Sequence, residues 1–389
     1  MLYLFSYQLY SFLNPAIFYF IFFLNFVFIS CSGGPLVISG GAVSKDVKGQ
    51  TPVTALAISH DAQYLLSGHD NGTVVLWNLR ESKVQEIHTD LSSKILTVDI
   101  NSEFGNIIAA ADEQGNLIAQ KIGGKTVFKH SQPKFPIFTI NISLDGKTIY
   151  CGGDDSLGYV FEINSGKLKD YLYKKGTSSA SVYCSALHQT YKNSYFVTGH
   201  QGGMIKIWNA SDNSLIIENK FADAPITAID FPNEKQYFAF GDAFGNIFLY
   251  SIPLEKLLKR KKSTSFITSL SFTKDGNGFI SSHKDNLIRF WNLDQDTGKI
   301  KFLDKSKKIH DGYICKIIMH ENLIITAGTD GFIKIMDNSY NLKATLMIEG
   351  NESWLIMDPF GNYAGSGKLL DEYSEKLIDQ DPNVLDRVL

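Results

Sequence analysis

Short runs rich in β-branched residues recur along most of the chain, each about six residues long and bounded by turn-forming residues. Seven of them begin with Val or Ile: Val53–Ile58, Ile95–Ile100, Ile137–Ile142, Val182–Leu187, Ile226–Phe231, Ile267–Phe272 and Ile314–Met319. Turn chemistry such as Asp145-Gly146 or Asp275-Gly276 follows most of them, and a second apolar run comes next. This pattern predicts strands joined by tight turns.

A polar turn separates the second run of each unit from a third. The turns read Asp70-Asn-Gly72, Glu113-Gln-Gly115, Asp154-Asp-Ser156, Gln201-Gly-Gly203, Ala243-Phe-Gly245, Lys284-Asp-Asn286 and Thr329-Asp-Gly331. Asn, Asp and Gly tolerate the positive φ that such hairpins demand. Each third run carries a large side chain at one position, 41 to 47 residues from the next: Trp77, Gln120, Phe161, Trp208, Tyr250, Trp291 and Met336. Without long amphipathic helices between the runs, the spacing predicts antiparallel repeats and excludes a parallel sheet.

Three segments, 67–78, 198–209 and 281–292, resemble WD-repeat β-propeller blades, and the resemblance covers roughly residues 47–340. It implies an all-β, seven-bladed β-propeller. It also implies a structural tetrad of His, Asp, Ser or Thr, and Trp within a blade. The positions that match this tetrad are Ser67, Asp70, Trp77, Thr198, Trp208, Ser281, Trp291, His310 and Thr326. The first repeat has Gln50 at the place of the His, and the seventh has Met336 at the place of the Trp.

The N-terminus differs from the rest of the chain. Residues 1–44 contain no Asp, Glu, Lys or Arg, and Ala16–Ser30 is almost continuously apolar. Such a block, ending at small residues, is typical of an export signal. The sequence Phe28-Ile-Ser-Cys31 resembles a bacterial lipobox, which implies a lipid anchor on Cys31. We therefore expect residues 1–30 to be a signal peptide or a membrane anchor. An ordinary cleaved signal and an uncleaved single-pass anchor remain alternatives.

The remaining boundaries follow from the repeats. We expect a flexible linker at 31–46, the propeller at 47–350, and a short hairpin–helix tail at 351–389 that packs on the propeller. Two segments compete to lie beside the last repeat, Pro35–Ser39 and Lys343–Ile348, and the second is favoured for its longer apolar alternation. Residues 353–366 and 381–389 resemble the tail of bacterial WD-repeat proteins, some of which carry a caspase-like peptidase domain.

Composition limits the function. The chain has 389 residues, 37 basic and 40 acidic, with a net charge of −3, which argues against a dedicated nucleic-acid binder. Four cysteines are too few for a disulfide scaffold. No zinc-binding, nucleophile-elbow or phosphate-loop motif is present. The basic run Lys256–Lys262 is interpreted as a solvated loop, with anionic lipid or an acidic partner as the alternative.

Two further groups of residues could suggest a site. His69, His200 and His283 share one repeat position, which could suggest a metal ring, but the position is interpreted as structural. Asp99 and Asp230 fall on innermost strands of non-adjacent repeats, so a paired-carboxylate site is not expected. No catalytic residue, metal or cofactor is predicted.

Together these patterns predict an exported, membrane-tethered propeller in the cell envelope, on the periplasmic or outer-membrane side. It would act as a non-catalytic scaffold that binds other proteins through its rim loops. No nucleic acid or small-molecule substrate is expected. The alternatives are a regulatory partner of a separately encoded peptidase, and a propeller enzyme of the hydrolase class.

Overall fold

The computed structural model describes residues 51–385 except 89, 132–134, 173–179, 191–192, 233–234, 264, 295–298 and 374–378. The predicted signal at 1–30, Cys31 and the segment Pro35–Ser39 lie outside the described residues. None of the helices among the described residues is long and apolar enough to span a bilayer.

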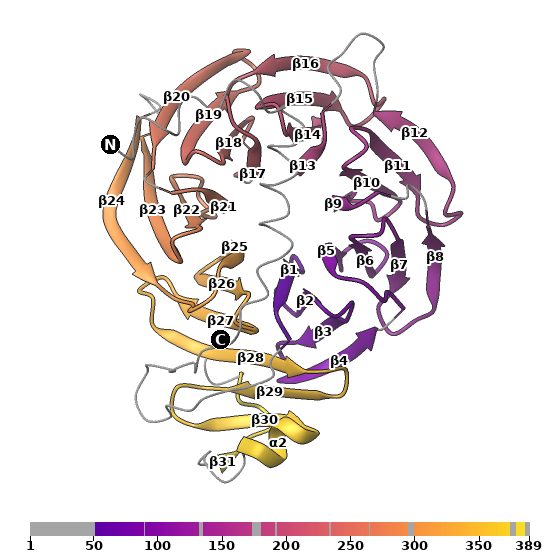
Figure 1. Ribbon diagram of the computed structural model, residues 1–389, viewed down its shortest axis with the longest axis vertical. Coiled ribbons are helices and arrows are strands. Elements are labelled where there is room, and N and C mark those ends of the chain that lie inside the picture. Colours follow the sequence, from indigo (N-terminus) through magenta and orange to yellow (C-terminus); the bar gives the residue numbers. More distant parts are fainter. Residues whose placement is uncertain are drawn as a thin grey trace, which may run out of the picture. The chain divides into compact units, whose positions relative to one another are not determined.

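Six sheets of four antiparallel strands stand around a common axis, and each is a simple meander of consecutive strands (Figure 1). We call them blades 1 to 6. Blades 1 and 2 contain β1 (Val53–Ile58), β2 (Tyr64–His69), β3 (Val74–Asn78), β4 (Lys83–His88), β5 (Ile95–Asn101), β6 (Ile107–Asp112), β7 (Leu117–Lys121) and β8 (Thr126–His130). Blades 3 and 4 contain β9 (Ile137–Ile142), β10 (Thr148–Gly153), β11 (Gly158–Glu162), β12 (Leu168–Leu172), β13 (Val182–Gln189), β14 (Ser194–His200), β15 (Met204–Asn209) and β16 (Leu215–Lys220). Blades 5 and 6 contain β17 (Ile226–Asp230), β18 (Tyr237–Asp242), β19 (Asn246–Ser251), β20 (Lys256–Lys262), β21 (Ile267–Phe272), β22 (Gly278–His283), β23 (Leu287–Asp294) and β24 (Lys299–Lys308).

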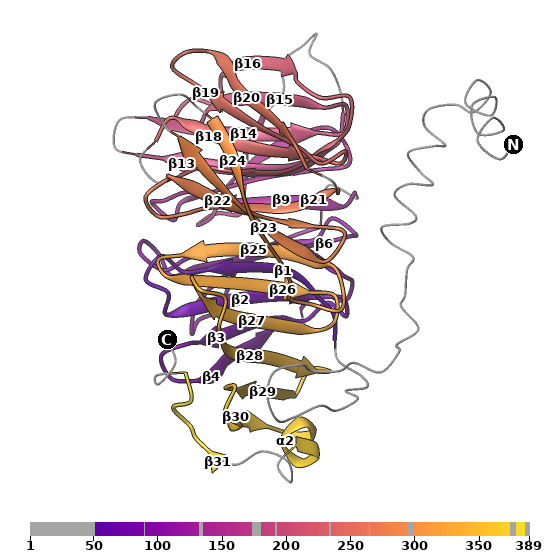
Figure 2. The ribbon, with the colours of Figure 1, turned by 90° about the vertical axis from the view of Figure 1, so that its left-hand side faces the viewer.

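The last sheet, here called the terminal sheet, has seven strands. They are β25 (Ile314–His320), β26 (Leu323–Gly328), β27 (Phe332–Asp337), β28 (Leu342–Glu349), β29 (Ser353–Met357), β30 (Asn362–Ser366) and β31 (Asp379–Gln380). The short helix α2 (Lys368–Tyr373) follows β30. Figure 2 shows β29, β30 and α2 continuing outward from β28.

The prediction of a seven-bladed propeller is therefore wrong. Six sheets are regular four-stranded blades, and the terminal sheet absorbs the tail. The physical reason is the free edge of β28, whose backbone groups pair with β29 along Thr345–Glu349. The segment Lys343–Ile348 does lie beside the preceding strand, as favoured from its alternation, because β28 pairs with β27.

Contact between neighbouring blades depends on the first residue of each innermost strand. These residues are β-branched and fully or almost fully buried: Val53, Ile95, Ile137, Val182, Ile226, Ile267 and Ile314. Four of them, Ile95, Val182, Ile226 and Ile267, pack closely against a glycine on the second strand of the preceding sheet. At Gly68 a Cβ atom would lie only 2.4 Å from Cγ2 of Ile95, and at Gly199 only 2.6 Å from Cγ2 of Ile226. A small residue is needed there because the next blade approaches so closely.

No strand is exchanged between blade 1 and the terminal sheet, since β1–β4 all come from one continuous segment. The two sheets share a hydrophobic core instead, in which Val53 and Trp77 pack with residues such as Ala327 and Leu346. Hydrogen bonds cross the same joint. Gly350 N donates to Thr51 Oγ1 at 3.2 Å, and Thr73 Oγ1 donates to Asn351 Oδ1 at 2.5 Å.

The end of the described chain strengthens this joint. Val384 and Leu385 are completely buried in the core that holds Trp77. Leu385 N donates to Ser82 Oγ at 2.8 Å, which ties the chain to the turn between β3 and β4. Residues 381–385 therefore act as a clasp between the terminal sheet and blade 1.

We expect Leu385→Ala to lower the free energy of unfolding by roughly 2–5 kcal/mol, since it leaves a cavity in the joint. The matched control is Phe360→Ala, because Phe360 is 74% exposed in the turn between β29 and β30. The control should change stability by about 0.5 kcal/mol or less. Urea denaturation of both variants measures this, and equal effects would show that the clasp does not bear on stability.

Candidate functional site

Blades 1, 4 and 6 each contain the same kind of buried hydrogen-bond chain, which starts at the tryptophan of the third strand. In blade 1, Trp77 Nε1 donates to Ser67 Oγ at 2.9 Å, and Ser67 Oγ lies 2.9 Å from His69 Nε2. Blade 4 repeats the chain with Trp208, Thr198 and His200, at 3.3 and 2.9 Å. Blade 6 repeats it with Trp291, Ser281 and His283, at 2.7 and 2.6 Å.

The far nitrogen of each imidazole reaches a backbone carbonyl in the loop that enters the blade. His200 Nδ1 lies 2.9 Å from Ala180 O, and His283 Nδ1 lies 3.1 Å from Ser265 O. A carbonyl only accepts, so Nδ1 carries the proton and Nε2 accepts from the hydroxyl. Burial lowers the pKa of His69, His200 and His283 to about 4, which keeps the imidazoles neutral at pH 7. The chain thereby holds the entering loop onto its own blade.

These histidines, on the second strand, replace the tetrad histidine that the resemblance placed in the preceding loop. Their common spacing, eight residues before the tryptophan, is the feature of the sequence that could have revealed this role. Blade 2 has Asp112 at the same place, and its carboxylate accepts from Ser93 Oγ of the entering loop at 2.7 Å. Asp70 does not join the chain in blade 1. Its carboxylate instead pairs with Lys94 at 3.1 Å near the surface.

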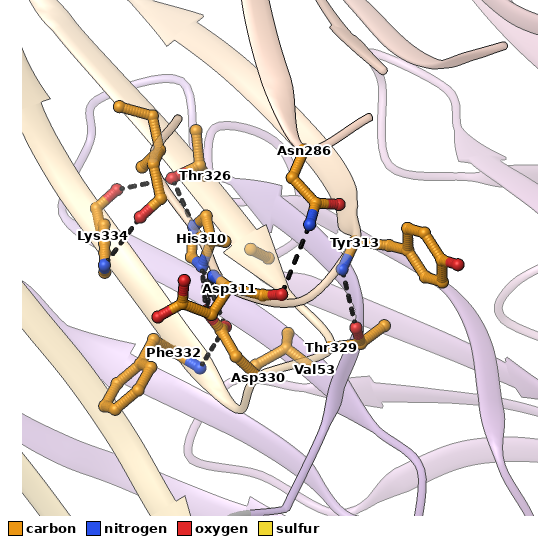
Figure 3. Close-up of polar contacts among 12 residues, drawn as sticks. Val53, Asn286, His310, Asp311, Tyr313, Thr326, Thr329, Asp330, Phe332 and Lys334 are labelled. Atoms are coloured by element: carbon orange, nitrogen blue, oxygen red, sulfur yellow. Dashed lines mark hydrogen bonds and ion pairs between the residues drawn. The ribbon is translucent and has the colours of Figure 1, made fainter. Parts of the chain in front are cut away.

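In the terminal sheet the histidine lies in the entering loop and not on the second strand, as Figure 3 shows. His310 comes from the entering loop, with Nε2 2.8 Å from Thr326 Oγ1 and Nδ1 2.9 Å from Asp330 Oδ1. Burial raises the pKa of Asp330, but the hydrogen bond with His310 and the charge of Lys334 outweigh this, so the pKa falls below its usual value. Lys334 Nζ donates to Ile309 O at 2.7 Å. Met336 fills the tryptophan place and is buried.

Above these chains, the loops of blade 5, blade 6 and the terminal sheet bond to one another. Ser263 N, in the loop that leads into blade 6, donates to Gly245 O of the β18–β19 turn in blade 5 at 2.6 Å. Within blade 6, Lys284 N donates to Phe266 O at 3.0 Å, and within the terminal sheet Thr329 N donates to Tyr313 O at 2.9 Å. Asn286 Nδ2 donates to Asp311 O at 3.3 Å (Figure 3). The loops therefore form one continuous, hydrogen-bonded surface.

Aromatic side chains lie on this surface around a lysine. Lys284 Nζ lies 6.0 Å from the ring centre of Phe266 and 5.7 Å from that of Tyr313, within the range of cation–π attraction. Phe244, in the turn between β18 and β19, is 63% exposed. We call Phe244, Phe266, Lys284 and Tyr313 the loop face. A rigid surface with exposed aromatic groups can bind a protein segment with little ordering of its own side chains.

The carboxylates on the innermost strands join blades rather than face one another. Asp99 Oδ2 accepts from Ile142 N at 2.6 Å, and Asp230 Oδ2 accepts from Phe272 N at 2.7 Å. Burial raises the pKa of both carboxyls to about 6, against the opposing effect of these amides and of the Lys316 charge. Each carboxylate thus bonds to the backbone of the next blade.

Among the described residues, no three His, Cys, Asp or Glu side chains lie together so that they could hold a metal ion. Both ring nitrogens of His69, His200 and His283 are occupied by the contacts above. Cys184 and Cys315 donate to backbone carbonyls, and burial raises their pKa and that of Cys151.

Comparison with known proteins agrees with this geometry. Residues 41–78 and 255–292 match the family model described as WD domain, G-beta repeat. The chain is similar to human WD repeat-containing protein 36, 24% identical over 60% of this chain and 24% of that protein. It is 24% identical to human protein NEDD1, over 60% of this chain and 36% of that protein. A BTB/POZ domain and WD-repeat protein of Acanthamoeba polyphaga mimivirus is 24% identical over 64% of this chain and 55% of its own length.

Among solved structures, the structure of U3-55K superposes with a TM-score of 0.63 and 14% identity, over 76% of this chain and 93% of that one. This likeness shows the fold alone. Two segments of the chain match the WD-repeat family model, and the chain spans between about a quarter and a half of the length of the three curated relatives named here. Those relatives are eukaryotic and viral, so the bacterial and caspase-associated resemblance of the tail stands on the sequence only.

We expect Trp77→Ala to lower the free energy of unfolding by roughly 3–5 kcal/mol through lost burial. Trp77→Phe keeps most of the apolar volume but removes the N–H that donates to Ser67, so its cost should be smaller, about 1–2 kcal/mol. Urea denaturation compares the two. A negligible cost of Trp77→Phe would contradict a separate contribution from the hydrogen-bond chain.

The buried histidines should make the protein less stable as the pH falls from about 6.5 to 4. Their folded-state pKa is lower than the unfolded one, so the unfolded chain binds more protons in this window. Each histidine contributes roughly 1.4 kcal/mol per pH unit there. Asp99 and Asp230 have the opposite sign, because their raised pKa means that the folded state binds more protons between about pH 4 and 6. His200→Asn should therefore flatten the dependence and Asp99→Asn should steepen it, as measured by urea denaturation at each pH.

Proposed function

We propose that this protein is a non-catalytic scaffold that binds a segment of another protein on the loop face. The observation that carries the proposal is Phe244, an aromatic ring that is 63% exposed in the β18–β19 turn, on loops that are hydrogen-bonded to those that hold Lys284 between two rings. Aromatic anchors of this kind contribute most of the affinity at protein interfaces. WD repeats in the chain support the same function, because propellers of this kind commonly bind proteins.

The chemistry of the loop face suggests the nature of the partner segment. Phe244 and the ring of Tyr313 offer apolar contact, and Lys284 offers a positive charge between two rings. An extended segment with an apolar or aromatic residue next to an acidic one would satisfy both. The hydrogen bonds beneath the loops keep the face in place before binding.

The proposal includes a membrane tether at the N-terminus, from the apolar run Ala16–Ser30 and the lipobox-like Phe28–Cys31. Lipidation of Cys31 would place the mature N-terminus at that residue with acyl groups attached. Intact mass of the protein purified from membranes tests this. A mass that includes residues 1–30 would contradict lipidation and leave an uncleaved anchor.

A photo-crosslinking amino acid placed at Phe244 should give discrete crosslinked products in the native cell. The matched control is Tyr171, which is 49% exposed on β12, an outer strand of blade 3. Adding Lys284→Glu should reduce the yield at 244 severalfold, since it reverses the charge in the stack. Once the partner is purified, Phe244→Ala should weaken binding by roughly thirtyfold or more, the loss typical of a hot spot.

Products of equal yield at 244 and 171, with no effect of Lys284→Glu, would overturn the loop face as the docking site. Circular dichroism of each variant checks that the fold is retained.

A further inference from the structure

Two outer strands of the ring, β20 of blade 5 and β24 of blade 6, lie next to each other on its perimeter. They contact one another directly, and both are on the left-hand side of Figure 1 and on the side that faces the viewer in Figure 2. In the sequence, the three inner strands of blade 6 lie between β20 and β24. Only the ring brings them together.

These two strands concentrate positive charge. β20 reads Lys-Leu-Leu-Lys-Arg-Lys-Lys, with no acidic residue, and β24 carries five lysines with one aspartate. The other outer strands carry less charge, because β4, β12, β16 and β28 each have one lysine and one acidic residue, and β8 has a single lysine. The positive charge is therefore local, although the whole chain has a net charge of −3.

The ammonium groups best placed to bind a partner are Lys256, Lys261, Lys262 and Lys301. All four are exposed, and none forms an ion pair with a carboxylate that the structure describes. Lysines farther along β24 are engaged within the protein. Lys307 Nζ donates to Tyr340 O at 2.9 Å, and Lys308 pairs with Asp311 at 2.6 Å.

Exposed leucines lie among these lysines. Leu254 is 59% exposed in the turn before β20, Leu257 is 37% exposed in β20, and Leu303 is 42% exposed in β24. We call the four lysines and three leucines the lateral basic face. Isolated exposed leucines are ordinary, but leucines that neighbour lysines in the same outer strands, with no ion pair among the described residues, match the two layers of a bilayer surface, anionic headgroups above and acyl chains beneath.

We propose that the lateral basic face binds the surface of an anionic lipid bilayer. The lysines would contact phosphate and carboxylate headgroups, and the leucines would enter the boundary with the acyl chains. Nucleic acid would also attract the lysines, but the leucines favour the bilayer because a phosphate backbone gives them nothing apolar to contact. The lateral basic face is distinct from the loop face, so a protein partner could bind while the ring rests on lipid.

The test uses the full chain with Cys31→Ser, so that neither an acyl group nor a reactive thiol is present at that position. Leu257→Cys carries an environment-sensitive fluorophore. Cys151, Cys184 and Cys315 react slowly, because burial raises the pKa of each thiol. The probe is a set of vesicles of phosphatidylcholine, with or without about 30% phosphatidylserine. The apolar run Ala16–Ser30 is common to every sample and carries no charge, so the difference between the two vesicles reports on the lysines.

We expect a blue shift of the fluorophore at 257 with phosphatidylserine vesicles, which high salt reverses. With phosphatidylcholine alone we expect no shift. The triple variant Lys256→Glu, Lys261→Glu and Lys301→Glu should abolish the shift. Its matched control, Lys121→Glu, Lys125→Glu and Lys169→Glu, changes the net charge equally on exposed lysines of blades 2 and 3 and should keep it. The same lysines changed to Gln provide a second pair if the Glu variants do not fold.

A second label position, Tyr171→Cys, should show no shift with either vesicle. The proposal is overturned if the shift at 257 is equal in both vesicles, if the control triple abolishes it as well, or if 171 shifts equally. It is also overturned if the chain ignores the vesicles but binds a labelled nucleic-acid duplex through the same three lysines, as fluorescence anisotropy would show. These outcomes are independent of the loop face, whose crosslinking at 244 needs no lipid.

Discussion

The packing of one β-branched residue against a small residue of the neighbouring sheet is the contact on which the ring depends. Each innermost strand starts with a buried Val or Ile, and at four of the joints the sheet before it presents a glycine at the facing position, as with Ile95 and Gly68. A larger residue at the facing position would push the sheets apart, and a smaller one at the strand start would leave a void. This spacing brings the innermost strands close enough for Asp99 and Asp230 to bond with the next blade.

In blades 1, 2, 4 and 6 and in the terminal sheet, a buried polar contact holds the entering loop, although the residues that form it differ. Blades 1, 4 and 6 use a histidine at the end of the second strand, blade 2 uses Asp112, and the terminal sheet uses His310 from the loop itself. All of them anchor the entering loop to the blade. Because the loops are held from beneath, their upper side chains are free to differ, and the loop face can carry a binding surface without a cost in stability.

The two proposed surfaces use different parts of the architecture. The loop face lies on loops at one end of the strands, where side chains are displayed by turns held with hydrogen bonds. The lateral basic face lies on outer strands, where the side chains of Lys256, Lys261, Lys262 and Lys301 are exposed. Because one surface is at the strand ends and the other is on the perimeter, the protein could hold a partner and a bilayer together. The clasp at 381–385 matters to both, since it closes the ring on which they are placed.

From the sequence alone, the period of the repeats, the places of the strands and the buried state of Trp77, Trp208 and Trp291 could be predicted, because alternation and turn chemistry are local properties. The prediction of a seven-bladed propeller was wrong, because the free edge of β28 pairs with β29 and merges the tail into one sheet. The role of His69, His200 and His283 was decided by the path of the entering loop, and the contact of β20 with β24 by closure of the ring. Such contacts join residues far apart in the sequence, and only packing determines which of them meet.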